Sequence, residues 1–203
     1  ERQFRRYRKG HSHGEEQGSD PASELVISMR ITLLGTGDAI GTPKIGCTCP
    51  QCIHAKTTGT MRLRTSLLIE NNGFHLLVDS SPDLRQQLLR YGSPHIDAVI
   101  WTHGHYDHFM GFGEFYRVQH IPPVFAVPPV MDYCTGIFSF LKFDERIIHP
   151  YEPFSLCGIT ITPFIVNHPP VYTCGMIFET GKSRVGFTSD TNHDIPQKSF
   201  DLL

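Results

Sequence analysis

The alternation of apolar and polar positions predicts a strand-rich chain from Met29 onward. The run RITLLG at 30–35 is typical of a strand, and the glycine-punctuated loop GTGDAIGTP follows it. In TSLLIENNGFHLLVDSS, at 65–81, two apolar runs flank Asn-Asn-Gly, a pattern typical of a β-hairpin. The apolar run HIDAVIWTH predicts a buried strand over 95–103. Further strands are predicted at 122–127 and near 146–149, 153–157, 159–166, 173–180 and 184–189.

Helical spacing is clearest in SPDLRQQLLRYG, at 81–92, where Leu84, Leu88 and Leu89 form an apolar face. Ser80 or Ser81 is placed to cap this helix, with Pro82 in the first turn and Gly92 as the stop. Helices are also predicted at 108–119, despite two glycines there, and at 128–141. Strands with interspersed helices and several hairpins predict a mixed α/β sandwich, with antiparallel-rich sheets and the helices outside.

The first 28 residues show neither pattern. They contain a basic block followed by a Gly/Ser/Glu-rich stretch. We interpret residues 1–28 as an expression-derived or disordered leader, with a native basic arm as the alternative. Residues 29–203 are then expected to form a single domain.

Composition argues against a membrane protein and does not favour a broad nucleic-acid-binding surface. A length of 203 residues supports one substantial core, and a net charge of -2 gives no electrostatic footprint for nucleic acid or an anionic membrane. No apolar run approaches the roughly 20 residues of a membrane span, and no signal peptide is visible. We therefore expect a cytoplasmic protein with no membrane partner; oligomeric state is not readable, and a homo-oligomer is allowed.

The segment VIWTHGHYDHFMG, at 99–111, places three histidines and an aspartate within six positions after an apolar run. Side chains alternate along extended chain, so His103 and His105 share one face and can share one metal ion. Asp107 and His108 lie just beyond, where a turn can direct them to a second ion. Two-metal hydrolytic sites hold their ions about 3.5–4 Å apart, a spacing that one such loop can serve. The alternative is a polar surface loop with incidental histidines.

A second cluster is GCTCPQC, in which Gly46 and Pro50 shape a tight turn around three thiols. The C-x-C-x-x-C spacing suits tetrahedral zinc, which requires a fourth Cys or His from elsewhere. In a chain without a secretion signal, metal ligation is favoured over a disulfide. Free cysteines in a loop are the alternative. We expect one structural zinc ion held by Cys47, Cys49 and Cys52.

The motif THGHYDH resembles the H-x-H-x-D-H signature of the metallo-β-lactamase superfamily, and other segments match in the family's order. The resemblance implies the family's αββα sandwich from Met29 onward. It implies that Asp79, in LLVDSSPD, buttresses the metal-binding loop, that His168 is the third histidine of the first metal, and that Asp190 bridges both metals. Read without the family, Asp79 could cap the next helix, His168 could be an ordinary loop residue, and Asp190 could form a turn.

The cysteine cluster and the loop LLGTGDAIGTP resemble the PhnP-like phosphodiesterase branch, typified by an enzyme that hydrolyses phosphoribosyl cyclic phosphate. Members continue past the bridging aspartate into a segment that supplies two histidines, one for the second metal and one for the cysteine site. This chain stops at PQKSFDLL, so we expect a fold that is C-terminally incomplete, or stand-in ligands such as His54 or His193. If these 203 residues were the whole polypeptide, we would expect one metal ion or a weakly occupied second metal site, with reduced activity.

The resemblance implies a metal-dependent hydrolase that cleaves a phosphodiester, such as a cyclic nucleotide-like compound, with hydroxide activated by two divalent ions, Zn or Mn. Asp107, Asp190 and Asp79 are the expected catalytic carboxylates. The expected partner is a small phosphodiester, and the charge balance does not favour nucleic acid. The alternatives are a tRNA 3′-processing-type endoribonuclease and a metal-binding module with impaired catalysis.

Overall fold

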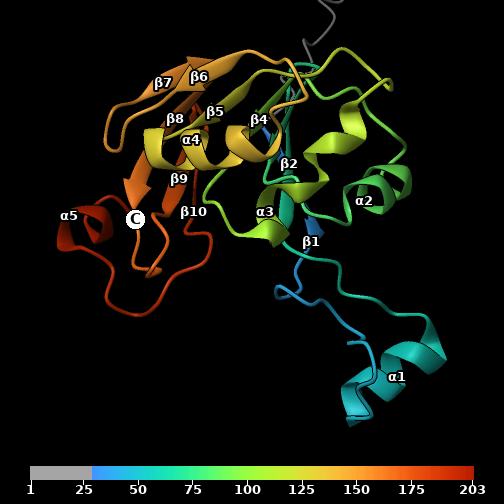
Figure 1. Ribbon diagram of the computed structural model, residues 1–203. Coiled ribbons are helices and arrows are strands. Elements are labelled where there is room, and N and C mark those ends of the chain that lie inside the picture. The colour runs from blue at the N-terminus through green and yellow to red at the C-terminus, as the bar shows by residue number, and fades with distance from the viewer. Residues whose placement is uncertain (1–28) are drawn as a thin grey trace, which may run out of the picture.

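The computed structural model describes residues 29–203, so the interpretation of residues 1–28 lies outside the described part. The predicted strands are present and form two sheets (Figure 1). The six-stranded sheet runs from β1 to β6 in order, with bounds Arg30–Gly35, Ser66–Asn71, Phe74–Val78, Ala98–Ile100, Val124–Ala126 and Glu145–Ile147. The four-stranded sheet has the order β10-β9-β8-β7, with bounds Ser183–Phe187, Cys174–Thr180, Ile159–Ile165 and Phe154–Leu156.

The predicted hairpin joins β2 to β3 through Asn72 and Gly73. Both turn residues have positive φ, +51° and +78°, as a two-residue turn of the I′ type requires. Strand β3 then pairs parallel with β4, β4 with β5, and β5 with β6. The carboxyl ends of parallel strands share one edge of a sheet, which is where loops carrying functional side chains collect.

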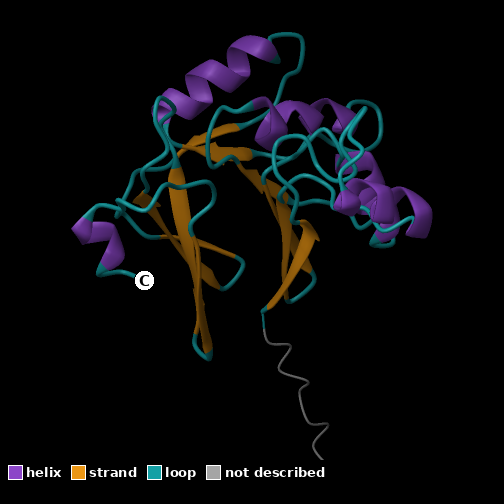
Figure 2. Ribbon diagram, turned by 90° about the horizontal axis from the view of Figure 1, so that it is seen from below, coloured by secondary structure: helices purple, strands orange, loops and turns teal. Residues whose placement is uncertain are grey.

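The two sheets pack face to face around one core (Figure 2). Leu68 and Leu76 of the larger sheet lie in the same buried cluster as Ile161, Met176 and Phe178 of the smaller one. Both sheets are therefore apolar on their facing sides, as two-layer packing requires. The predicted α/β sandwich is confirmed.

The helices lie outside the sheets, with α5, Gln197–Phe200, beside the four-stranded sheet (Figure 2). No helix within residues 29–203 combines the length and the apolar character needed to cross a membrane. Two helices, α1 and α5, were not among the sequence predictions. The bounds are α1 Pro50–Thr58, α2 Leu84–Arg90, α3 Tyr106–Phe109, the 3₁₀ helix η1 Met110–Phe115, α4 Pro128–Ile137 and α5 Gln197–Phe200.

The single helix predicted over 108–119 is wrong. The chain forms α3 and then the tighter η1, which ends at Phe115. The reason is a close approach to the loop after β3: the N–H of Gly111 donates to the carbonyl of Ser80 at 2.9 Å, and the N–H of Ser80 donates to the carbonyl of His108 at 2.7 Å. A Cβ at Gly111 would lie 1.9 Å from the carbonyl oxygen of Ser81. These contacts replace the helical hydrogen-bond ladder.

The helix predicted over 81–92 is present, but it begins at Leu84, so Pro82 precedes it. The hydroxyl of Ser81 accepts the N–H of Asp83 at 3.1 Å and thus closes the turn before the helix. Asp83 occupies the cap position, but its carboxylate accepts from Arg64 and makes no cap hydrogen bond. The helix ends at Arg90, and Gly92 follows with a φ of +89°.

Candidate metal centre

The predicted site residues come from three segments that meet at one edge of the sandwich. The loop after β4 carries His103 and His105, and α3, which follows it, carries Asp107 and His108. The β8–β9 loop carries His168, and the turn after β10 carries Asp190. The backbone ties these segments together: Cys174 N–H donates to the carbonyl of Thr102 at 3.1 Å, and Asn192 N–H donates to the carbonyl of Asn167 at 2.6 Å. Residues far apart in the sequence are thereby held against one another.

The first group is His103, His105 and His168. The Nδ1 atom of His105 lies 3.1 Å from Nε2 of His103 and 3.0 Å from Nε2 of His168. The Nδ1 atom of His105 has only one site for a hydrogen bond, so a single shared proton cannot account for both of these contacts. Zinc binds imidazole nitrogens at about 2.0–2.1 Å, which puts neighbouring ligands roughly 2.9–3.4 Å apart. The three nitrogens therefore fit around one divalent ion.

The second group is built around His108. Its Nε2 atom lies 3.3 Å from a carboxylate oxygen of Asp107 and 3.6 Å from one of Asp190. The other oxygen of Asp190 lies 3.9 Å from Nε2 of His168, which belongs to the first group. Metal-ligating atoms of His103, His108 and Asp190 are within 4.8 Å of one another. Asp190 thus stands between the two groups, where the resemblance places a bridging ligand.

Behind these groups lies Asp79, fully buried. One carboxylate oxygen lies 2.6 Å from Nδ1 of His108, and the other accepts the backbone N–H of Thr102 at 2.9 Å. The Thr102 hydroxyl donates to the same carboxylate at 2.8 Å and lies 3.0 Å from Nδ1 of His103. Such outer partners fix the tautomer and the ring orientation of metal-binding histidines. Asp79 makes none of the contacts of a cap to α2, so the capping alternative is wrong.

The sequence analysis missed Thr102, which connects Asp79 to His103. Its hydroxyl also lies 2.9 Å from the hydroxyl of Ser189, the residue before Asp190. The only local signal was its position, directly before the first histidine at the end of an apolar run. Because its role depends on Asp79, 23 positions away, sequence spacing alone does not reveal it.

The electrostatics of the site differ between its two groups. Burial lowers the pKa of His103 to about 4, so its imidazole is neutral at pH 7. Burial also acts to lower the pKa of His108, but the carboxylates of Asp79, Asp107 and Asp190 together raise it to about 12. The hydrogen bond to His108 in turn lowers the pKa of Asp190 to about 2. The proton on His108 therefore neutralises part of the negative charge of these three carboxylates. A bound divalent cation could neutralise that charge in its place.

The cysteine cluster is separate from this centre. Its last member, Cys52, lies in α1, which stands apart from the sheets (Figure 1). The sulfur atoms of Cys47, Cys49 and Cys52 lie within 4.8 Å of one another, and none is in a disulfide. Gly46 has a φ of +72°, and the Lys44 N–H donates to the sulfur of Cys52 at 3.3 Å. The N–H of Cys52, together with the neighbouring thiols, lowers the pKa of Cys49 to about 7.

The two stand-in ligands suggested by the sequence do not join these groups. His193 has 90% of its side chain exposed and lies 3.2 Å from Asp194. His54 lies on α1 and lines a hollow with Arg62. Within residues 29–203, no fourth ligand completes the cysteine cluster.

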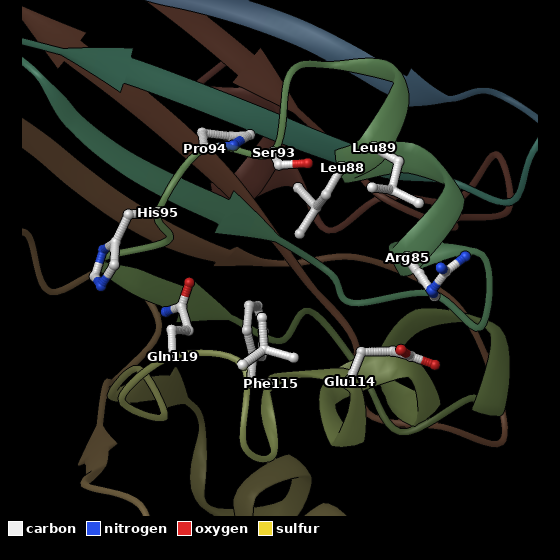
Figure 3. A pocket seen from close by; sticks show the side chains of 10 residues that line it. Arg85, Leu88, Leu89, Ser93, Pro94, His95, Glu114, Phe115 and Gln119 are labelled. Carbon is white, nitrogen blue, oxygen red and sulfur yellow. The ribbon is translucent and has the colours of Figure 1, made fainter.

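Two hollows bear on where a ligand could bind. One, of about 320 Å³, adjoins the metal centre and includes Gly104 and His105 in its wall. The other, of about 380 Å³, lies between α2 and η1 (Figure 3). Arg85 and Glu114 stand at one end of it, and His95 at the other. The hollow between α2 and η1 contains none of the predicted site residues. The smaller hollow beside the metal centre is therefore the better candidate for the ligand-binding site.

Comparison with known proteins agrees with this geometry. Residues 75–202 match the beta-lactamase superfamily domain. An octanoyltransferase of Porphyromonas gingivalis is 34% identical over 155 residues, 69% of this chain and 31% of that protein. A coenzyme PQQ synthesis protein B of Methylobacterium nodulans is 38% identical over 184 residues, 80% of this chain and 59% of that protein. Among solved structures, a diphosphatase from the PhnP family has a TM-score of 0.68 at 29% identity, covering 74% of this chain and 62% of that one.

This chain thus spans between about a third and three fifths of the length of these relatives. The matched region contains the histidine cluster, His168 and Asp190, and the fold is the hydrolase-type sandwich that the motif implied. On the family match and the shared fold together, the chain belongs to the beta-lactamase superfamily.

Proposed function

We propose that this chain forms the metal-dependent catalytic part of a phosphodiesterase. The observation that carries the proposal is the convergence of three imidazole nitrogens, with contacts of 3.0 and 3.1 Å, beside a second group that Asp190 joins to the first. Paired ion sites of this kind serve in-line displacement at phosphorus, because one ion can stabilise the attacking oxygen and the other the leaving oxygen.

In this proposal His103, His105 and His168 would hold one divalent ion, while His108, Asp107 and Asp190 would hold a second. The donor set of imidazoles and carboxylates suits zinc or manganese. When bound, the ions would supply a Lewis acid and lower the pKa of a water molecule toward neutrality.

The remaining residues position these ligands. Asp79 holds Nδ1 of His108 at 2.6 Å, which leaves Nε2 facing Asp107 and Asp190. Thr102 does the same for His103, whose Nε2 then faces His105. Because both rings are almost completely buried, water does not compete for these hydrogen bonds, and the ligands are preorganised.

The proposed substrate class is based on the paired donor groups of the site more than on the names of the relatives. Those relatives include an octanoyltransferase and a coenzyme synthesis protein. The name of the structural neighbour, a diphosphatase of the PhnP family, supports phosphorus ester chemistry. The cysteine cluster, which resembles that branch, would hold a structural zinc ion through Cys47, Cys49 and Cys52. A net charge of -2 gives no support to a large nucleic acid substrate.

The test is hydrolysis of bis(p-nitrophenyl) phosphate by protein loaded with zinc and, separately, with manganese. We expect turnover that a chelator abolishes and that His168→Ala reduces by about 100-fold or more, since ligand loss removes an ion. His193→Ala is the matched control: it removes a histidine three positions from Asp190 that lies outside both groups, and it should leave turnover unchanged. Metal-loaded protein that binds zinc but does not cleave the diester would contradict the proposal in favour of a metal-binding module.

A further inference from the structure

The hollow beside the metal centre is lined by α4 and by the β8–β9 loop, the loop that also carries His168. One wall is formed by α4, through Pro129, Val130 and Tyr133, and the other by the end of the β8–β9 loop, through Pro170, Val171 and Tyr172. His105 and Gly104 also line it. A group attached to a phosphorus atom at the metal centre therefore has this hollow as its neighbour.

Tyr133 is held rigidly over the metal-binding loop. A Cβ at Gly104 would lie 2.7 Å from Cδ1 of Tyr133, so the glycine between the two histidines allows the ring to rest on the loop backbone. The ring also packs edge-to-face with Phe109, with 6.0 Å between centroids. Tyr133 nevertheless remains 57% exposed. A fixed and exposed aromatic ring is suited to contact a ligand with little loss of side-chain entropy.

Tyr172, which lines the same hollow from the β8–β9 loop, is also fixed relative to the proposed metal ligands. The N–H of Val171 donates to the carbonyl of His168 at 3.0 Å, which closes the turn between the ligand and Tyr172. Two residues further on, Cys174 N–H donates to Thr102 at 3.1 Å and anchors the loop to the end of β4. Tyr172 is 39% exposed.

The charge of the lining restricts what the hollow can take. Apart from His105, its walls contain no ionisable side chain other than the two tyrosine phenols, and no Lys, Arg, Asp or Glu from the described residues. A second phosphate group normally binds through Arg or Lys, which supply charge-assisted hydrogen bonds. The hollow offers none, whereas proline, valine and tyrosine surfaces match an uncharged planar ring.

We propose that Tyr133 and Tyr172 recognise an uncharged aromatic or heteroaromatic ring of the substrate, so that the ester is an aryl or nucleoside phosphodiester and not a polyphosphate. This inference rests on the proposed phosphodiesterase function, because it assumes that the phosphoryl group binds at the metal centre. The tyrosines are specificity determinants, and they take no part in bond cleavage.

The experiment measures the binding of phenyl phosphate, methyl phosphate and pyrophosphate to the zinc-loaded protein by calorimetry. Phenyl phosphate should bind roughly fivefold to tenfold more tightly than methyl phosphate, as expected for ring stacking on tyrosine. Tyr133→Ala and Tyr172→Ala should each remove most of this advantage, while Tyr133→Phe keeps it because the ring remains. Tyr116→Ala is the control, since Tyr116 is an exposed tyrosine that does not line the hollow.

Hydrolysis of bis(p-nitrophenyl) phosphate is measured on the same samples, which separates the two proposals. Turnover without a ring advantage, or with pyrophosphate as the tightest ligand, overturns the inference and leaves the phosphodiesterase proposal intact. A ring advantage that the alanine variants remove, without turnover, leaves the binding site standing and overturns the phosphodiesterase proposal. If there is neither turnover of the diester nor tighter binding of phenyl phosphate, both proposals are overturned.

Discussion

Replacing Asp79 by asparagine removes the charge behind His108 with little change in shape. Asp79 has a φ of +61°, and asparagine adopts this left-handed region readily, so the substitution adds little backbone strain. The carboxylate oxygen 2.6 Å from Nδ1 of His108 can become an amide nitrogen, which donates. When His108 is neutral, as a metal-ligating imidazole must be, its one proton is then forced onto Nε2, the nitrogen that faces Asp107 and Asp190.

Two magnitudes follow from the burial of this pair. The side chains of His108 and Asp79 are 1% and 0% exposed, and breaking a pair buried to this degree costs about 3–5 kcal/mol. Asparagine keeps an oxygen for Thr102, so we expect metal-free Asp79→Asn to lose about 3 kcal/mol of unfolding free energy, at the lower end of that range. Loss of such an outer partner also weakens metal binding by about 10–100-fold.

The stability is measured by urea denaturation with a chelator present, at pH 6. The folded-state pKa of His108 is raised, to about 12, so its stabilisation is fully present below the unfolded pKa of about 6.5 and is lost as the pH rises toward 12. Zinc affinity is measured by competition with a chromophoric chelator at pH 7.

Asp97→Asn serves as the control. Asp97 also accepts a backbone N–H, that of His75 at 2.8 Å, but it lies outside the metal centre. It should leave zinc affinity unchanged. If Asp79→Asn binds zinc as tightly as the parent chain, at both sites, the Asp79–His108 contact does not position the metal ligands and the reasoning is refuted.

Two further predictions concern the loop behind the site and the cysteine cluster. Gly111→Ala places a Cβ 1.9 Å from the Ser81 carbonyl oxygen and should lower the free energy of unfolding by about 3 kcal/mol. Gly136→Ala in α4 is the control: its Cβ meets nothing within 4 Å, and it should raise the free energy of unfolding by about 0.5–1 kcal/mol. Equal urea midpoints for the two variants would contradict the packing argument. In metal-free protein the alkylation of Cys49 by iodoacetamide should rise through about pH 7, while Cys174, whose pKa burial raises to about 12, stays unreactive. Peptide mapping by mass spectrometry checks this, and protection of Cys49 by zinc should follow.

Local patterns predicted the strands well because each strand carries its own signal. The Asn-Gly turn between β2 and β3 requires positive φ, which those two residues tolerate, so the hairpin could be predicted from residues 65–81 alone. The cluster from His103 to His108 was equally local, since alternation along extended chain puts two histidines on one face. The positions of His168 and Asp190 came from the family's motif order, because neither has a distinctive local pattern.

The parts that sequence reasoning missed depend on contacts between distant segments. The helix predicted over 108–119 gives way to η1 because the backbone of Gly111 bonds to the loop after β3, and no periodicity within the segment reveals that partner. Thr102 acquires its role only when Asp79 lies behind it. Tyr133 and Tyr172 face one hollow only because α4 and the β8–β9 loop are brought to the same edge of the sandwich. Sequence alone therefore determined the candidate ligand types and the fold class, which depend on side-chain chemistry and short-range periodicity. Tertiary structure decided which hydrogen bonds orient those ligands and what surface adjoins them, because both depend on packing between segments far apart in the chain.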